Sequence, residues 1–407
     1  MSLFSRGSKN KTELGLVYDI GSASVGGALV LFSPEKKPKV IYSVRRDMAF
    51  QKNLNTSRME LSMYKVVASV SEDLVKNGIP HLRFTALGTL RPKKVFCTLA
   101  SPWLASQTRT AHVVFDRPQK IRQADIVSRV VKEREEFFKS KDVVELIGKD
   151  THMLIEEKVV RVLLNGYETS QLESNNIRTM DISTVFSVAP LGIVQGISDE
   201  IHRVFSSCET SFHSFSAILF NALRDATEEK IRDFVMIDIS GEVSDVSVVS
   251  DMNLVETVTF PIGKKTLIRH IAESAGIGTE EVLSYIYLSR EGEITGRSKG
   301  KITKAIEGAR DMWYRSYEHA LTDLADTHTL SHSVFFTSDP DVKTWFRDII
   351  DDAEMIHFGA EQGEGVVHGI DPLYLKSWCD VAKDAESDVF LMVGVICAQK
   401  LFQSGTI

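Results

Sequence analysis

Two hairpin-like stretches constrain the fold of this chain more than any other feature. In residues 14–32, an apolar run reaches Asp19, crosses a turn of small residues and continues as a second apolar run. Residues 234–250 follow the same course around Asp238. Each pattern predicts a β-hairpin with a carboxylate at its tip. Two such hairpins, far apart in the sequence, predict paired subdomains that face each other across a ligand.

Length and composition indicate an ordinary globular protein with several subdomains. At 407 residues the chain exceeds the usual size of a single core. A net charge of -7 argues against generic nucleic-acid binding, so we expect no nucleic-acid partner. The four cysteines contain no CxxC pair, which favours reduced thiols in a cytosolic compartment over disulfides or a zinc site.

The regions around the first hairpin predict two kinds of unit. A strand at 39–44 and a helix at 59–74 complete a β-β-β-α order by residue 80. Residues 84–189 predict a compact α+β unit with its own small sheet and a helix at 119–140. The strands expected in that unit are 95–100, 108–115, 154–164 and 182–188.

Helices dominate the chain beyond residue 190. The residue pattern predicts helices at 193–205, 264–275, 280–287, 302–325 and 341–353, and a buried strand at 333–337. A polar, charged helix is expected at 221–232. The run 388–399 predicts an apolar helix without a basic face, so we expect it to pack against the first sheet. No stretch approaches the ~20 apolar residues of a membrane span.

The N-terminal residues 1–12 carry basic side chains but no apolar core of a secretory signal. We expect a disordered leader there. The alternative is a weak peripheral membrane contact through Leu3, Phe4, Arg6, Lys9 and Lys11.

The hairpin tips carry residues suited to phosphate chemistry. Phosphates need backbone N–H groups and small side chains that let the backbone approach, and an accompanying Mg²⁺ prefers carboxylates and water. The first tip supplies Asp19, Gly21 and Ser22, and the second supplies Asp238, Ser240 and Gly241. Either set alone is common in plain turns, but the pairing of the two favours a functional role.

The sequence around these tips resembles a known superfamily. Residues 19–25, DIGSASV, resemble the first phosphate motif of the actin/sugar-kinase/Hsp70 superfamily, and residues 238–245, DISGEVSD, resemble the second. The unit at 84–189 is similar to the inserted subdomain of bacterial FtsA and PilM, and residues 260–272, FPIGKKTLIRHIA, are similar to the segment after the second motif. The resemblance covers nearly the whole chain.

This resemblance implies an α/β fold of two actin-like lobes, a duplicated ribonuclease H-like unit, with a small α+β insertion. The first lobe would comprise residues 1–83 and 190–232 with the C-terminal helix 378–407. The insertion would be 84–189. The second lobe would be 233–377, with a helical subdomain at about 264–328.

The resemblance also implies the site and its ligands, which are ATP and Mg²⁺. Asp19 and Asp238 would hold the metal and its waters. The phosphates would be lined by Gly21, Ser22, Ser240 and Gly241, Gly263 would lie near the base of the cleft, and Ser338 would mark the adenine-side turn.

Three departures from the superfamily pattern bear on hydrolysis. Glu242 would bring a carboxylate toward the γ-phosphate, which is unfavourable unless magnesium or a lysine compensates. Gly26 stands where relatives often place a lysine, and Ser338 and Asp339 stand where a Gly-Gly turn is usual. We therefore expect ATP binding with weak or absent hydrolysis, and whether the chain is an enzyme stays open.

The implied function is that of an actin-like cytoplasmic scaffold, peripheral to the inner membrane. An FtsA-like cell-division adaptor is the first hypothesis, and a PilM-like component of a type IV pilus platform is the second. Expected partners are further copies of the chain, in protofilaments or dimers, and the peptide tail of a division-ring or pilus-platform protein. A small-molecule kinase of the same superfamily is the third hypothesis, but no convincing catalytic aspartate is evident between the two motifs.

Overall fold

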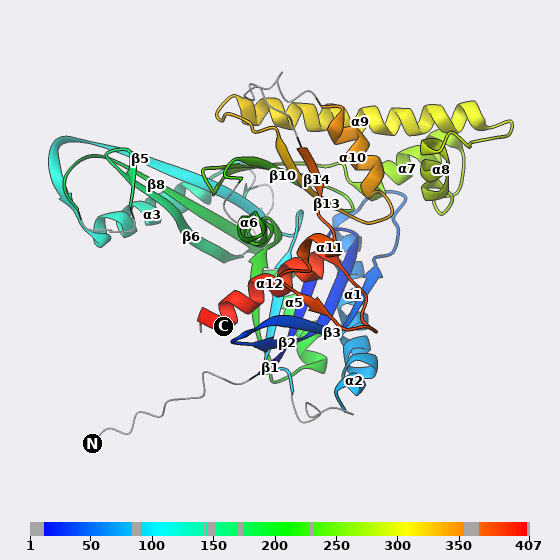
Figure 1. The fold of residues 1–407 in the computed structure, drawn as a ribbon, viewed down its shortest axis with the longest axis horizontal. Helices are drawn as coiled ribbons and strands as arrows, with labels where there is room; N and C mark the ends of the chain where they lie inside the picture. Colours follow the sequence, from blue (N-terminus) through cyan, green and yellow to red (C-terminus); the bar gives the residue numbers. More distant parts are fainter. Residues whose placement is uncertain are drawn as a thin grey trace. The chain divides into compact units, whose positions relative to one another are not determined.

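The computed structural model describes residues 12–83, 91–141, 143–144, 151–169, 174–227, 231–353 and 366–404. The leader residues 1–11 considered above lie outside this set. The chain forms two compact units, whose elements are labelled in Figure 1. The first unit comprises Met1–Ala100, Val194–Ala226 and Ile370–Ile407, and the second comprises Ser101–Ile193 and Thr227–Gly369.

The first unit contains a six-stranded sheet with the order β15-β3-β2-β1-β4-β9. Its strands are β1 (Glu13–Ile20), β2 (Ser24–Ser33), β3 (Lys36–Asp47), β4 (Lys94–Leu99), β9 (Glu209–Ser214) and β15 (Asp380–Val381). Strands β1, β2 and β3 are antiparallel neighbours, whereas β4 and β9 continue the sheet in parallel with β1. Nearly every residue of β1 is buried, as expected for a central strand covered on both faces. The predicted first hairpin is confirmed.

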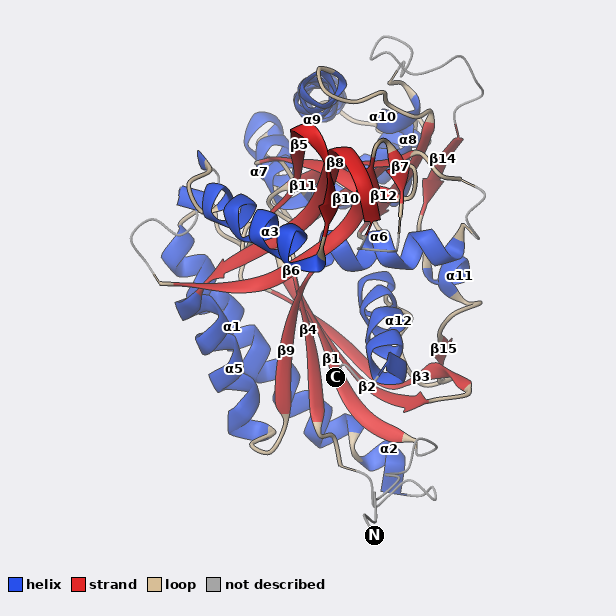
Figure 2. Cartoon of the chain, turned by 90° about the vertical axis from the view of Figure 1, so that its left-hand side faces the viewer, coloured by secondary structure: helices blue, strands red, loops and turns tan. Residues whose placement is uncertain are grey.

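Helices cover both faces of this sheet, with α1 and α12 on opposite sides in Figure 2. The helices of the unit are α1 (Thr56–Asp73), the π-helical turn Leu74–Gly78, α2 (Pro80–Arg83), α5 (Leu191–Val204), α6 (Phe215–Ala226), α11 (Pro372–Leu375) and α12 (Val389–Ser404). Helix α12 packs against β1, β2, β3 and β4, which confirms the expectation for the apolar run 388–399.

The helix predicted at 221–232 overlaps α6 only at residues 221–226; residues 231 and 232 are not helical, and residues 228–230 lie outside the described residues. Helix α6 begins at Phe215, because buried residues recur there at helical spacing: Phe215, Ile218, Leu219, Ala222 and Leu223. The polar residues that suggested a later helix follow its buried part.

The second unit contains a five-stranded sheet with the order β12-β11-β10-β13-β14. Its strands are β10 (Phe234–Ile239), β11 (Ser244–Ser250), β12 (Asn253–Phe260), β13 (Ser333–Ser338) and β14 (Val366–Gly369). The first three are antiparallel and the last two continue in parallel, so the order and directions repeat those of β3-β2-β1-β4-β9. The second hairpin is thus confirmed, and the two sheets form a structural duplication.

A helical layer packs on this second sheet around Trp313. It consists of α7 (Lys264–Ala275), α8 (Val282–Arg290), α9 (Lys299–Ala325) and α10 (Lys343–Asp351). Trp313 is fully buried on α9, stacks on Tyr317 and donates from Nε1 to the hydroxyl of Ser244, 3.1 Å away. That bond ties α9 to the first residue of β11.

A four-stranded sheet with the order β5-β8-β6-β7 forms the α+β region of the second unit. It comprises β5 (Ala105–Ile121), β6 (His152–Leu164), β7 (Tyr167–Glu168) and β8 (Ser174–Pro190), with α3 (Gln123–Phe137) beside it. Both β5 and β6 contact β12, and Thr108 Oγ1 donates to the carbonyl oxygen of Leu254 at 2.9 Å.

The helix predicted at 119–140 begins too early. Residues 119–121 belong to β5, where Gln119 pairs with Ile177. Strand pairing with β8 therefore overrides the helical spacing at this boundary.

No helix among the described residues is both long and apolar enough to cross a bilayer. All four cysteines, Cys97, Cys208, Cys379 and Cys397, are buried free thiols.

The contact between β2 and α1 provides a direct test of the packing. A Cβ on Gly27 would lie 2.4 Å from Cγ1 of Val70, so Gly27→Ala forces α1 away from the sheet. We expect it to lower the free energy of unfolding by about 1–3 kcal/mol in urea denaturation. The control Gly192→Ala meets no atom within 4 Å, and should leave stability unchanged or raise it by up to about 1 kcal/mol. Equal effects of both variants would contradict this packing.

Candidate functional site

The first candidate site surrounds Asp19, near the end of the central strand β1. Its carboxylate is only 3% exposed. The hydroxyl of Thr98 donates to Asp19 Oδ1 at 3.0 Å and to the carbonyl oxygen of Tyr18 at 3.2 Å. Asp19 and Thr98 are direct neighbours in the parallel β1/β4 pairing. The sheet register therefore delivers a hydroxyl to the buried carboxylate.

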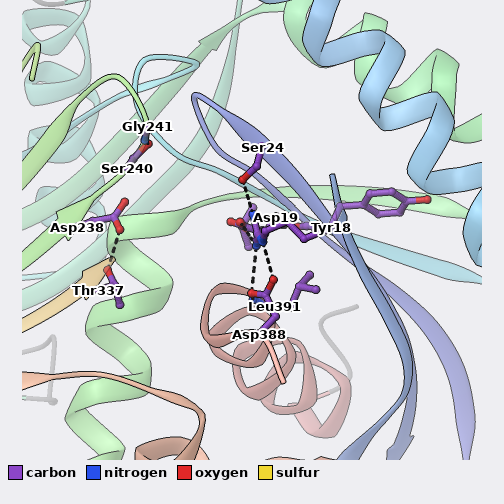
Figure 3. Close-up of polar contacts among 11 residues, drawn as sticks. Tyr18, Asp19, Ser24, Asp238, Ser240, Gly241, Thr337, Asp388 and Leu391 are labelled. Atoms are coloured by element: carbon purple, nitrogen blue, oxygen red, sulfur yellow. Dashed lines mark hydrogen bonds and ion pairs between the residues drawn. The ribbon is translucent and has the colours of Figure 1, made fainter. Parts of the chain in front are cut away.

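Arg45, from β3, provides the second partner of Asp19. Its Nη2 donates to Asp19 Oδ2 at 2.8 Å and to Asp388 Oδ1 at 3.1 Å. Nε donates to Asp388 Oδ2 at 2.5 Å, and Nη1 donates to the hydroxyl of Ser24 at 2.9 Å. Figure 3 shows Asp19, Ser24 and Asp388 gathered around this network. One guanidinium thus joins three segments of the first unit.

The absence of a side chain at Gly26 makes this reach feasible. Asp19 pairs with Gly26 across β1 and β2, and Gly26 pairs with Arg45 across β2 and β3. Directly paired residues place their side chains on the same face of a sheet. A Cβ on Gly26 would lie 2.7 Å from Nη2 of Arg45. The guanidinium therefore crosses above Gly26 to reach Asp19.

Asp388 connects the same network to the C-terminal helix α12. Its Oδ1 accepts the backbone N–H of Leu391 at 3.0 Å, as a helix-capping carboxylate does. The guanidinium carbon of Arg45 also lies 5.1 Å from the ring centre of Phe390, within cation–π range. The start of α12 is therefore fixed, through Arg45, to the tip of the first hairpin.

Burial and charge act in opposite directions on these groups. Burial raises the pKa of Asp19 and the nearby Asp388 adds to that rise, while Arg45 and Thr98 reduce it. Burial would lower the pKa of Arg45, but the two carboxylates outweigh it and hold that pKa above its ordinary value. Arg45 is therefore a permanent positive charge in this site.

The second candidate site repeats the first around Asp238, near the end of β10. The hydroxyl of Thr337 donates to Asp238 Oδ1 at 2.7 Å and to the carbonyl oxygen of Ile237 at 3.4 Å. Asp238 and Thr337 are direct neighbours in the β10/β13 pairing, and both are buried. Figure 3 shows this pair. The aspartate–threonine unit of the first site thus occurs a second time.

The neighbouring positions, however, differ in charge between the two copies. In the second hairpin Asp238 pairs with Asp245, which pairs in turn with Thr259. Asp245 thus corresponds to Gly26, and Thr259 corresponds to Arg45. Burial raises the pKa of Asp245, and the hydroxyl of Thr259 donates to it at 2.5 Å. The second copy has a further carboxylate where the first has a gap, and a hydroxyl where the first has a cation.

The turn after β10 rests on the start of α7. A Cβ on Gly263 would lie 2.5 Å from the carbonyl oxygen of Ser240 and 2.6 Å from that of Gly241. The backbone N–H groups of Lys264 and Lys265 donate to the same two oxygens, at 3.0 and 2.7 Å. Gly263 is therefore needed for this close approach. The structure places it directly against the predicted phosphate residues Ser240 and Gly241.

Glu242 lies in this turn and is compensated by an arginine. Nη1 of Arg269 donates to Glu242 Oε1 at 2.9 Å, Nη2 binds the other oxygen, and Thr266 Oγ1 donates to it at 3.1 Å. The carboxylate is 93% buried by these contacts with α7. Arg269, rather than magnesium or a lysine, therefore compensates the charge of Glu242.

The turn after β13 is held by a lysine. Lys264 Nζ donates to Asp339 Oδ2 at 2.9 Å and to Asp341 Oδ2 at 2.6 Å. Burial lowers the pKa of Lys264, but the two carboxylates outweigh it and raise that pKa overall. Ser338, the predicted adenine-side residue, is buried as the last residue of β13 and pairs with Ile239 of β10.

The predicted site residues therefore fall into two groups. Asp19, Gly21 and Ser22 lie together at the first hairpin tip, and Asp238, Ser240, Gly241, Gly263 and Ser338 lie together in the second unit. In the first group, the N–H of Gly21 donates across the tip to the carbonyl oxygen of Ser24 at 3.1 Å, and Ser22 is buried.

Four residues of these sites were not predicted from the sequence: Thr98, Thr337, Arg45 and Asp388. A repeated signal does precede the threonines, since residues 95–98 are VFCT and residues 334–337 are VFFT. The two other residues carry no such signal, because Arg45 is one of many charged residues and Asp388 lies 343 positions further along the chain.

The two motif carboxylates differ in how well they suit Mg²⁺. Asp19 does not suit it, because Thr98 and Arg45 already bind its two oxygens and the guanidinium adds a positive charge beside them. Asp238 suits it better, because Thr337 is uncharged and Asp245 supplies a second carboxylate across the hairpin. Within the described ranges, no three His, Cys, Asp or Glu side chains are grouped as metal ligands.

Comparison with known proteins identifies the fold. No protein-family model matches the sequence, and no curated protein matches it. Among solved structures, the PilM–PilN type IV pilus biogenesis complex matches 96% of this chain and 98% of its own, with 12% identity and a TM-score of 0.56.

Two further structures align with lower similarity. The ethanolamine utilization protein EutJ from Carboxydothermus hydrogenoformans aligns over 96% of this chain and 91% of its own, with 12% identity and a TM-score of 0.43. A Bacteroides thetaiotaomicron protein with actin-like ATPase fold and unknown function aligns over 98% and 99%, with 9% identity and a TM-score of 0.36.

The chain thus has an actin-like α/β fold of the PilM type, since the match to PilM–PilN extends over nearly the full length of both chains. This confirms the resemblance and the fold class that the two motifs predicted.

Replacing the two motif threonines tests their bonds to the aspartates. We expect Thr98→Val and Thr337→Val each to lower the free energy of unfolding by about 1–3 kcal/mol at neutral pH, because a buried carboxylate loses a donor. Thr184→Val is the control, since the buried hydroxyl of Thr184 has no hydrogen-bond partner among the described residues. That variant should be neutral or stabilising.

The effect of Thr98→Val should also depend on pH. The hydroxyl stabilises the ionised carboxylate, so its loss raises the already elevated pKa of Asp19 further. Below that pKa the carboxyl group is protonated, so removing the hydroxyl costs little stability. Above it the carboxylate is ionised, and the variant loses the full stabilisation that the hydroxyl provides. Denaturation of the variant and wild type between about pH 4 and pH 8 should show a difference that grows with pH. A constant difference would contradict this account.

Proposed function

We propose that this chain is a nucleotide-binding scaffold of the PilM type, which docks a peptide of a membrane protein at the inner face of the membrane. The observation that carries the proposal is the match over nearly the full length of both chains to PilM in its complex with PilN. The duplicated aspartate–threonine unit supports a retained nucleotide site. Self-association into dimers or protofilaments belongs to the same proposal.

The motif in the second unit suits a metal-bound nucleotide better than the motif in the first unit does. Asp238 would hold the Mg²⁺ that accompanies ATP, and Ser240 and Gly241 would line the phosphates. The bound metal would supply positive charge to the phosphate oxygens. Glu242 is turned to Arg269 in this arrangement, so it does not add an uncompensated charge. The proposed role is a binding-induced change of the scaffold rather than hydrolysis.

Nucleotide binding can be measured by thermal shift with Mg²⁺-ATP. We expect wild-type protein to be stabilised, because a ligand that binds only the folded state raises its melting temperature. The Asp238→Asn variant should show much less of this rise in melting temperature, because it lacks the negative charge at the proposed metal position. Asp323→Asn, in the exposed His319–Asp323 pair, serves as the control and should keep it. No stabilisation of wild type by ATP would overturn the nucleotide part of the proposal.

A groove in the first unit offers a place for the partner peptide. It lies between the end of β3 and the first turns of α1, with a volume of about 500 Å³. The groove is lined by Ala49, Phe50, Gln51, Lys52, Asn53, Arg58, Leu61, Ser62 and Lys65. Phe50 and Leu61 are 40% and 60% exposed. Three cationic side chains beside exposed apolar ones suit a peptide that carries acidic and apolar residues.

Localisation of a fluorescent fusion in the native cell tests this docking. We expect wild-type protein at the cell envelope and Leu61→Glu/Lys65→Glu protein diffuse in the cytoplasm, because the two changes add charge to one face of α1. The control Lys132→Glu lies on the exposed surface of α3 and should localise as wild type does. A double variant that remains at the envelope would exclude the groove as the docking site.

The pattern of the same fusion separates the two scaffold hypotheses. Foci at the poles or periphery support a pilus-platform role. A band at mid-cell supports the FtsA-like division adaptor instead. That role is the second candidate because FtsA and PilM both belong to the superfamily that the two motifs resemble.

A further inference from the structure

We propose that Arg45 is the resident cation of the first phosphate motif, occupying the place beside Asp19 that a hydrated divalent ion would take. The first motif then binds no metal, because Arg45 takes the metal's place. Any dependence of nucleotide binding on a divalent ion comes from the Asp238 motif. Only the assignment of divalent-ion dependence to the Asp238 motif rests on the proposed nucleotide binding. The ion network itself is independent of any nucleotide.

The sheet register fixes Arg45 in this position. Asp19, Gly26 and Arg45 are consecutive cross-strand neighbours on β1, β2 and β3, so one face of the sheet carries all three. Gly26 leaves the path open, since even a Cβ there would lie 2.7 Å from the guanidinium. A flexible surface arginine could leave such a pair, but only 18% of this side chain is exposed.

The donors of Arg45 are almost fully used inside the protein. A guanidinium has five N–H groups. Four of them form hydrogen bonds in the protein: one donates to Asp19, two donate to Asp388 and one donates to Ser24. At most one remains for a ligand, so Arg45 acts as a fixed structural charge rather than as a phosphate-binding arm.

A divalent ion beside Asp19 would have to displace this network. Magnesium requires ligand oxygens at about 2.0–2.1 Å in near-octahedral geometry. The oxygen that it would use on Asp19 is already 2.8 Å from Nη2 of Arg45, and the other oxygen accepts from Thr98. A dication there would face a guanidinium a few ångströms away, which is strongly repulsive in a buried site.

The second copy of the motif differs from the first at the positions of both Arg45 and Gly26. Thr259, which is uncharged, corresponds to Arg45, and Asp245 replaces the gap at Gly26. The first copy thus combines one carboxylate of the hairpin with a built-in cation. The second combines two carboxylates with hydroxyl groups. The duplication has therefore diverged in charge at equivalent positions.

The experiment compares the melting temperatures of wild type and Asp19→Asn in excess Mg²⁺ and in EDTA, each with and without ATP. Asp19→Asn keeps Arg45 paired with Asp388, so the variant retains a partner for its buried cation. We expect the same destabilisation in all four conditions. A loss that is greater with Mg²⁺ than with EDTA would overturn the inference, because Asp19 would then contribute to metal binding.

A second variant, Arg45→Ala, removes the resident cation. It leaves Asp19 and Asp388, both of which bind the same Nη2, as a pair of unneutralised carboxylates. Without ATP, we expect Mn²⁺ to raise the melting temperature of this variant more than that of wild type, and Arg45→Ala/Asp19→Asn to lose the additional rise. A Mn²⁺ response of wild type that Asp19→Asn abolishes would overturn the inference. Failure of ATP to bind would instead count against the proposed function. The Mn²⁺ responses measured without ATP would still test the inference about Arg45.

Discussion

The hydrogen bond between a buried aspartate and a threonine on the adjacent parallel strand is the interaction on which both halves depend. A carboxylate at the end of a central strand has no water to solvate it, so its charge must be met by protein donors. Thr98 and Thr337 meet it from equivalent positions, and each also bonds the backbone oxygen of the residue before the aspartate. The sheet register alone brings these pairs together.

The two halves then solve the same electrostatic problem differently. In the first, Arg45 neutralises Asp19 and connects it through Asp388 to α12, so the motif becomes part of the permanent structure. In the second, Asp238 and Asp245 lie opposite each other without an arginine at the corresponding position, and Gly263 and α7 hold the neighbouring turn. This division favours a scaffold whose first motif is rigid and whose second motif responds to ligand.

The sequence predicted the hairpins and their aspartates because strand patterns and turn residues are local signals. It also placed Gly263 within the site by resemblance. Arg45 and Asp388 were missed because their roles come from strand register and from a contact across 343 positions. The predicted starts of two helices were wrong. Strand pairing outweighs helical spacing at residues 119–121, and burial places the start of α6 at Phe215. Magnesium or a lysine was considered as the partner of Glu242, and Arg269 was not, because it lies more than a helical turn into α7.

If an arginine is the cation of the first motif, a metal ion should bind only at the second. Anomalous scattering from Mn²⁺ in crystals grown with ATP would locate the ion. We expect a manganese peak beside Asp238, with Arg45 still bonded to Asp19 and Asp388. A manganese ion on Asp19 or its water ligands, with Arg45 displaced, would contradict this expectation.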